Sequence, residues 1–162
     1  MSTLAPLMEA WDESHREFAI ALGGMPDEDV WRRAHPRLLS VGELAGHVAY
    51  WEAVWVFGNG PDGLDLEKLP VASPLVNAAF RYYSSNVGQA AELGLGAAQV
   101  LEEVAGIHKA AKVALANVGK EEPRPDWGTW GALVQYQVFH VAYHAGQVYS
   151  VRHLLGHETE DN

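Results

Sequence analysis

The amino-acid sequence predicts an all-α protein whose long helices pack as a four-helix bundle. Alanine occurs 23 times, whereas threonine occurs three times and isoleucine twice, a balance that favours helix over sheet despite the 17 valines. Four long segments repeat apolar residues at three- and four-residue intervals, and no strand pattern lies between them. Each apolar stripe must be buried against the others, which a helix bundle achieves.

The first two helices are marked by clear start and stop signals. The apolar spacing predicts a helix over residues 3–23, which stops at Gly23-Gly24-Met25-Pro26. A loop with a turn of helix is expected over residues 27–39. Ser40-Val41-Gly42-Glu43 is a capping box, in which serine and glutamate each satisfy a backbone N–H left free at a helix start. The second helix is therefore expected to begin there and to end near Phe57.

The middle of the chain predicts less regular structure. Residues 58–74 are rich in turn-forming and acidic residues, which indicates an exposed loop. Residues 75–86 are apolar and aromatic and suit either a short helix or an excursion between longer ones.

Two further helices complete the bundle. Helical spacing predicts a third long helix over residues 97–118, with Gly119 as its C-cap glycine. Thr129 is the expected N-cap of a last helix that runs to Leu155 and is closed by Gly156. The 162 residues thus form one domain over 1–156, followed by an acidic tail over 157–162.

Charge and composition exclude several classes of partner. The chain has 11 basic and 21 acidic residues, and its basic residues cluster only at Arg32, Arg33 and Arg37. Nucleic acids and anionic membranes need a positive footprint, so neither is expected as a partner. No uninterrupted apolar run approaches the length of a membrane span, and the N-terminus does not resemble a secretory signal. The absence of cysteine excludes disulfides and a cysteine nucleophile, and we expect a cytoplasmic protein.

Eight histidines in a cysteine-free chain are the main chemical signal. Any metal ion must be held by imidazole and carboxylate. His140 and His144 are four residues apart on a predicted helix, so they lie on one face and can share one ion. Tyr143 and Gln147 share their sector, which makes this a polar and aromatic strip. Two bare imidazoles in a bundle core need partners.

A third ligand is expected from another helix, and His47 is the best candidate. Tyr50 and Trp51 share its helical sector, so His47 lies on an inward-facing aromatic face. Three histidines from two helices leave coordination positions open, as catalytic metal sites do. His15 lies on another apolar stripe, and whether it or the 58–74 loop contributes to the site is left open.

The remaining histidines are expected to lie elsewhere. His108 flanks the apolar stripe of its helix and is predicted to be structural. His153 is displaced by about 140° from the sector of the His140 pair. His157 lies beyond the last helix, and His35 precedes a proline in a loop.

Two stretches of the chain carry a family resemblance. Residues 40–52 place a histidine after a Ser-x-x-Glu helix start, and residues 139–156 contain His-x-x-x-His-x-Gly-Gln. Together they resemble the DinB/YfiT-like superfamily. The resemblance implies a bundle of up-down-down-up topology. It also implies a divalent ion (nickel, zinc, iron or manganese) at His47, His140 and His144.

The resemblance also implies a range of activities. Similar proteins include thiol-dependent transferases, a mycothiol-dependent maleylpyruvate isomerase and hydrolases, often as homodimers. We therefore expect a metal-dependent transferase or hydrolase that acts on a small molecule, with any low-molecular-weight thiol supplied from outside. Tyr143 and Gln147 would orient a ligand, and Tyr50 and Trp51 would wall the pocket. Two alternatives remain: a stress-related bundle that binds metal or a small molecule without turnover, and a metal-free interaction module with structural histidines.

Overall fold

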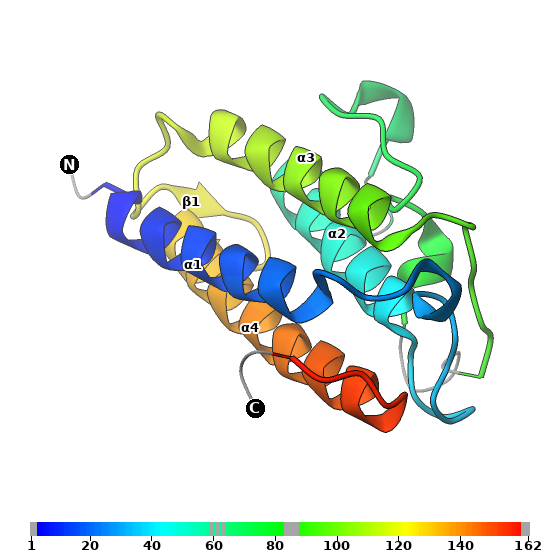
Figure 1. The fold of residues 1–162 in the computed structure, drawn as a ribbon. Coiled ribbons are helices and arrows are strands. Elements are labelled where there is room, and N and C mark those ends of the chain that lie inside the picture. The colour runs from blue at the N-terminus through cyan, green and yellow to red at the C-terminus, as the bar shows by residue number, and fades with distance from the viewer. Residues whose placement is uncertain (1–2, 59, 61, 63, 83–87, 160–162) are drawn as a thin grey trace.

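A computed structural model of the chain contains four long helices packed as a bundle (Figure 1). The structure describes residues 3–58, 60, 62, 64–82 and 88–159. The helices are α1 (Ala5–Leu22), α2 (Val41–Phe57), α3 (Ala97–Leu115) and α4 (Trp130–Leu154). In Figure 1, α1 lies beside α4 and α2 beside α3, and the α1/α4 pair runs opposite to the α2/α3 pair. The predicted all-α, up-down-down-up bundle is confirmed.

Helix α2 is covered by α3, by α4 and by the turn η3 (Ala78–Phe80). Fourteen of its 17 residues are buried, so it contributes to the core on nearly every side and lacks the polar face of a surface helix. Its predicted capping box is present. The Ser40 side chain accepts from the Glu43 N–H at 3.2 Å, and the Glu43 carboxylate accepts from the Ser40 N–H at 2.7 Å.

The end of α3 differs from the prediction. The helix stops at Leu115 with Ala116 as its C-cap, three residues before the expected end. Gly119 is not the C-cap glycine. It forms an isolated antiparallel bridge with Thr3, and its N–H donates to the Glu122 carboxylate at 2.6 Å. These contacts tie the start of the chain to the connection after α3.

The connection into α4 contains a small hairpin that the sequence pattern did not indicate. Its strands, β1 (Pro123–Arg124) and β2 (Gly128–Thr129), pair antiparallel. Two residues per strand are too few for alternation to be read from sequence. Thr129 is the N-cap of α4, as predicted, and accepts from the Ala132 N–H at 3.1 Å. Gly156 follows the helix with a φ of 87°.

Between α2 and α3, the residues that the structure describes form two short 3-10 turns. They are η2 (Leu66–Lys68) and η3 (Ala78–Phe80), in agreement with the predicted loop and excursion. A third such turn, η1 (Asp27–Asp29), follows α1. The predicted segment 75–86 and the tail each reach residues outside the described ones, at 83–87 and 160–162. Of the helices that the structure describes, none is both long and apolar enough for a membrane span.

Candidate metal centre

The histidine trio (His47, His140 and His144) meets inside the bundle between α2 and α4. One ring nitrogen of each histidine lies within 4.8 Å of the others. The Nε2 atoms of His140 and His144 are 3.2 Å apart, and the His47 ring centroid lies 4.8 Å from that of His144. His140 and His144 are only 5% and 7% exposed. The fold therefore brings together the three residues that the sequence singled out.

The outer nitrogens of two trio members are held by oxygen acceptors. His47 Nδ1 lies 2.9 Å from the carbonyl oxygen of Phe80, and His144 Nδ1 lies 2.6 Å from Gln147 Oε1. Because these oxygens only accept, each Nδ1 carries the proton and donates. A neutral ring then has its lone pair on Nε2, which is the arrangement that orients metal-binding histidines.

Burial keeps the trio neutral. Burial, together with the neighbouring imidazoles, lowers the pKa of His140 to about 2. Burial and the His47 ring lower the pKa of His144 to about 4, although the hydrogen bond that His144 donates to Gln147 opposes the shift. Burial also lowers the pKa of His47, against the hydrogen bond to Phe80. Metal ligands must be deprotonated, so the trio is in the right state at neutral pH.

The trio fits a divalent cation better than it fits a purely structural role. The facing Nε2 atoms of His140 and His144 share either the N–H proton of a neutral His140 ring or a cation. In addition, His140 Nδ1 is buried without a hydrogen-bond partner among the described residues. Such a group costs about 1–3 kcal/mol. A purely structural role does not account for that cost, whereas three converging imidazole nitrogens are a donor set that suits a divalent ion.

Glu43 on α2 holds Tyr82 and Ala91, and the ring of Tyr82 lies 6.3 Å from that of His47. The fully buried Glu43 carboxylate accepts from the Arg33 guanidinium at 2.6 and 2.7 Å, from Tyr82 Oη at 2.9 Å and from the Ala91 N–H at 2.9 Å. Burial raises the pKa of Glu43, but Arg33 and the backbone donors outweigh it and the net pKa is lowered. Glu43 was predicted only as half of a capping box, and its contacts with Tyr82 and Ala91 were missed.

A glycine on α2 allows Phe80, two residues before Tyr82, to come close to the helix. A Cβ at Gly46 would lie 2.5 Å from the Phe80 ring. The absence of a side chain therefore lets Phe80 pack on the helix, where its carbonyl reaches His47. No pattern in the sequence predicts this contact, because the acceptor is a backbone atom on a loop.

Two clefts open on the trio. The ring cleft, about 380 Å³, is lined by His47, Trp51, Trp55, Tyr82, Tyr136, Phe139, His140, Tyr143 and His144. The aliphatic cleft, about 330 Å³, is lined by Arg37, Leu38, Leu39, Leu44, His47, Tyr82, Tyr143, His144, Gln147, Ser150, Val151 and Leu154. His47, Tyr82, Tyr143 and His144 line both clefts, so the trio lies where the clefts meet.

The predicted pocket residues divide between these clefts. Trp51 lines the ring cleft, Gln147 lines the aliphatic cleft, and Tyr143 lines both. Tyr50 is buried on α2, edge-on to Trp51 at 5.3 Å, and lines neither cleft. The described residues of the 58–74 loop line neither cleft as well.

The structure places His15 in a second buried group, the carboxylate cluster (Asp12, His15, Glu52 and His108). His15 Nε2 lies 2.8 Å from one Glu52 oxygen, and His108 Nδ1 lies 3.1 Å from the other. His108 Nε2 lies 2.8 Å from Asp12 Oδ1. Glu52 was missed, although it is a charged residue within the otherwise apolar run Ala49–Val56, which is a signal that could have found it.

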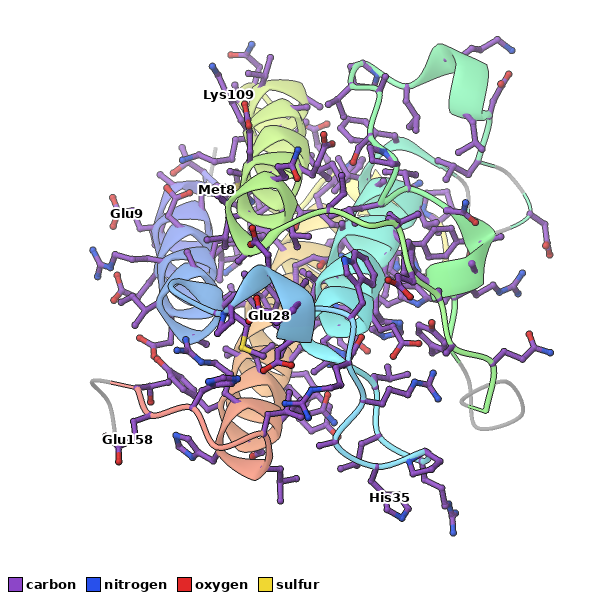
Figure 2. All side chains as sticks on the ribbon, turned by 45° about the vertical axis from the view of Figure 1, so that its right-hand side comes forward. Met8, Glu9, Glu28, His35, Lys109 and Glu158 are labelled. Atoms are coloured by element: carbon purple, nitrogen blue, oxygen red, sulfur yellow. The ribbon has the colours of Figure 1, made fainter. Side chains whose placement is uncertain are left out.

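The other histidines lie away from both groups. His35 is at the tip of the loop between α1 and α2 and points away from the bundle (Figure 2). His157 pairs with Asp29 at 2.6 Å, and His153 lies 3.4 Å from Thr159. None of them joins the trio, as predicted.

Comparison with known families agrees with this geometry. The family model of the DinB superfamily matches residues 10–148. The chain belongs to the DinB superfamily. No curated protein and no solved structure matches the chain. The DinB match includes the whole histidine trio, and the buried trio is consistent with a metal-binding member of this superfamily.

Proposed function

We propose that this DinB protein is a divalent-metal-dependent transferase that joins a low-molecular-weight thiol to a small electrophile. The trio supplies the metal ligands. The observation that carries the proposal is the convergence of three neutral imidazoles at the junction of two clefts. When bound there, a divalent ion supplies Lewis-acid chemistry and lowers the pKa of a thiol or of water.

Residues around the trio orient its rings, and the described lining residues would leave the charge of a bound ion unneutralised. The Phe80 carbonyl and Gln147 Oε1 fix the rings of His47 and His144. No carboxylate lines either cleft among the described residues. A divalent ion would therefore keep its full positive charge and attract a thiolate.

The pair of clefts favours a reaction of two substrates. The aliphatic cleft has polar groups at Arg37, Gln147 and Ser150, which suit a polar thiol, and Arg37 is exposed and matches a carboxylate on it. The ring cleft is left for the electrophile. A C–S bond would form at the junction as the S–H bond breaks. In an addition across a double bond the proton ends on the electrophile, and in a substitution the displaced group leaves with the electron pair of its broken bond and takes up the proton. The chain has no cysteine, so the sulfur must come from the cosubstrate.

Hydrolysis is the second candidate reaction, with water in place of the thiol. We further propose a cytoplasmic location, where such thiols are kept reduced, and a homodimer, as the family resemblance implies. Binding without turnover and a metal-free module are the non-enzymatic alternatives.

Metal analysis combined with turnover tests the proposal. The purified protein is incubated with nickel, zinc, manganese or iron, dialysed and analysed for bound metal, with one ion per chain expected. Disappearance of free thiol is then followed with a panel of electrophiles, and His144→Ala should abolish the metal-dependent rate. His153→Ala, outside the trio, is the control. A protein that retains no ion contradicts the proposal, and an ion without turnover supports the carrier or sensor alternative.

A further inference from the structure

The described residues that wall the ring cleft all carry aromatic or imidazole rings. Among these nine residues, none has an aliphatic or a charged side chain. Tyr136 lies nearly parallel to His140, at 5.9 Å between centroids and 19° between planes. Trp55 stands edge-on to both, at 5.2 and 5.8 Å. The walls therefore offer both flat and edge-on ring surfaces next to the trio.

Contacts outside the cleft hold these walls in place. Trp127 lies 5.1 Å from Trp55 and 4.7 Å from Tyr136, measured between ring centroids. Trp51 packs on Trp55 at 4.8 Å. Packing against Trp51 and Trp127 thus fixes the positions of Trp55 and Tyr136. A ligand would enter a preformed space and would not need to order loose side chains.

The mouth of the cleft has exposed rings. Phe139 and Tyr143 are 59% and 53% exposed and stack on each other at 5.8 Å and 27°. A flat ligand entering between the walls would cover part of both rings. The volume of about 380 Å³ is at the lower end for ligand pockets, so it suits one small ring system.

The charge of the site determines whether a cationic or an anionic group of the ligand can face the trio. Aromatic walls alone would also attract a cation. With neutral imidazoles and no lining carboxylate among the described residues, however, a bound divalent ion leaves the site strongly positive. A cation is then repelled, and an anionic oxygen or sulfur is attracted.

We propose that the ring cleft binds a planar conjugated molecule that lies against Trp55 and Tyr136 and points an anionic oxygen or sulfur at the trio. This rests on the proposed function, because the ion provides the positive charge. It extends that function by naming the substrate class. Ring stacking and edge contacts add to the gain from area burial, so flat ligands bind more tightly than saturated ligands of the same size.

A matched pair of carboxylates tests the proposal. 2-Naphthoate and decalin-2-carboxylate have similar size and the same charge but differ in planarity. Binding to the zinc-loaded protein is measured by calorimetry and by quenching of tryptophan fluorescence. We expect 2-naphthoate to bind at least tenfold tighter than decalin-2-carboxylate. We also expect it to bind at least tenfold tighter than the cation naphthylmethyl-trimethylammonium, and to bind more weakly when zinc is removed.

Variants locate the binding. Trp55→Leu should remove the preference for the planar acid and leave the zinc affinity unchanged. Trp130→Leu is the matched control, because Trp130 is also a half-buried tryptophan but lies outside the cleft. Phe139→Leu, at the exposed rim, should weaken 2-naphthoate severalfold without threatening the fold.

The outcomes separate the two proposals. Failure to bind any of nickel, zinc, manganese and iron overturns the proposed function itself. Normal zinc binding with equal affinity for the two carboxylates overturns only the substrate class. The same is true if the cation binds more tightly than 2-naphthoate, or if Trp130→Leu and Trp55→Leu have equal effects.

Discussion

The two buried histidine groups of this bundle place the same residue type among different chemical partners. In the carboxylate cluster, the contacting ring nitrogens of His15 and His108 face carboxylate oxygens of Glu52 and Asp12. In the trio, no carboxylate is present among the described residues, and ring nitrogens face one another. Shared protons complete the first group, whereas the second offers its nitrogens to a cation. The partners of a buried histidine, more than its burial, decide its chemistry.

Ring orientation strengthens the contrast. The rings of His15 and His108 stack at 3.7 Å with 24° between their planes. One ring nitrogen of each faces an oxygen of the same Glu52 carboxylate. His140 and His144 instead stand at 82° to each other, and His47 stands at 74° to His144. In the trio, three nitrogens therefore lie within 4.8 Å of one another with no carboxylate among them in the described residues.

Metal binding should separate the two groups most strongly. We expect His140→Ala to weaken zinc binding by more than about 100-fold, because it removes a direct ligand. His108→Ala should leave the zinc affinity and a stoichiometry of one ion per chain unchanged. Calorimetric titration of both variants and the wild type measures the difference. Loss of an ion in His108→Ala would show that the carboxylate cluster also holds metal and would break the comparison.

Stability should show the reverse pattern. Glu52 is 1% exposed, and burial raises its pKa, but the two histidines outweigh this and keep the pKa low. Glu52→Ala leaves buried imidazoles without their acceptor. We expect the free energy of unfolding to fall by about 3–5 kcal/mol, as when one partner of a buried ion pair is removed.

Urea unfolding at pH 7 measures this effect, and zinc affinity serves as a second readout. Glu102→Gln is the control, because Glu102 is exposed on α3 and its substitution should change stability by less than about 0.5 kcal/mol. Weakened zinc binding in folded Glu52→Ala would mean that the two groups are not independent.

The pH dependence of the carboxylate cluster follows from His108. Burial disfavours its charged form, but Glu52 and then Asp12 outweigh burial and raise the pKa of His108. A raised pKa means that the native state holds the proton more tightly than the unfolded state. The stabilisation is therefore complete below the ordinary histidine pKa of about 6.5 and is lost as pH rises through the native value.

We expect His108→Gln to cost about 1.5–3 kcal/mol near pH 5.5, the worth of hydrogen bonds to charged groups. The cost should shrink steadily above pH 7. Urea unfolding of both proteins from pH 5.5 to 8.5 measures it. A cost that is constant or grows with pH would mean that His108 is neutral in the native state and that protons do not complete the cluster.

The parts of the site that could be predicted from sequence are those set by local spacing. Ser40 and Glu43 are three residues apart, and His140 and His144 are four apart, so helix geometry alone joins them. The inward-facing aromatic sector of His47 predicted it as the third ligand, the DinB resemblance implied the same residue, and in the fold the three meet.

The parts that were missed depend on distant partners. Glu52 contacts histidines 37 and 56 residues away, on two other helices. Local rules predict Gly119 as the C-cap of α3. In the structure the helix ends earlier, at Leu115, and Gly119 pairs with Thr3 near the N-terminus. Local patterns do not contain such contacts, and tertiary packing overrides them.

The smallest expected effect tests how the fold supports the trio. Gly46→Ala would place a Cβ 2.5 Å from the Phe80 ring and displace the carbonyl that holds His47. Overpacking of this kind costs about 1–3 kcal/mol of stability, and loss of an orienting acceptor weakens metal binding by about tenfold. Gly106→Ala is the matched control, since an added Cβ there meets nothing within 4 Å on α3. It should stabilise the protein by about 0.5–1 kcal/mol and leave zinc binding unchanged. If Gly46→Ala is destabilised but binds zinc normally, the Phe80 carbonyl does not orient His47, and the trio depends on α2 and α4 alone.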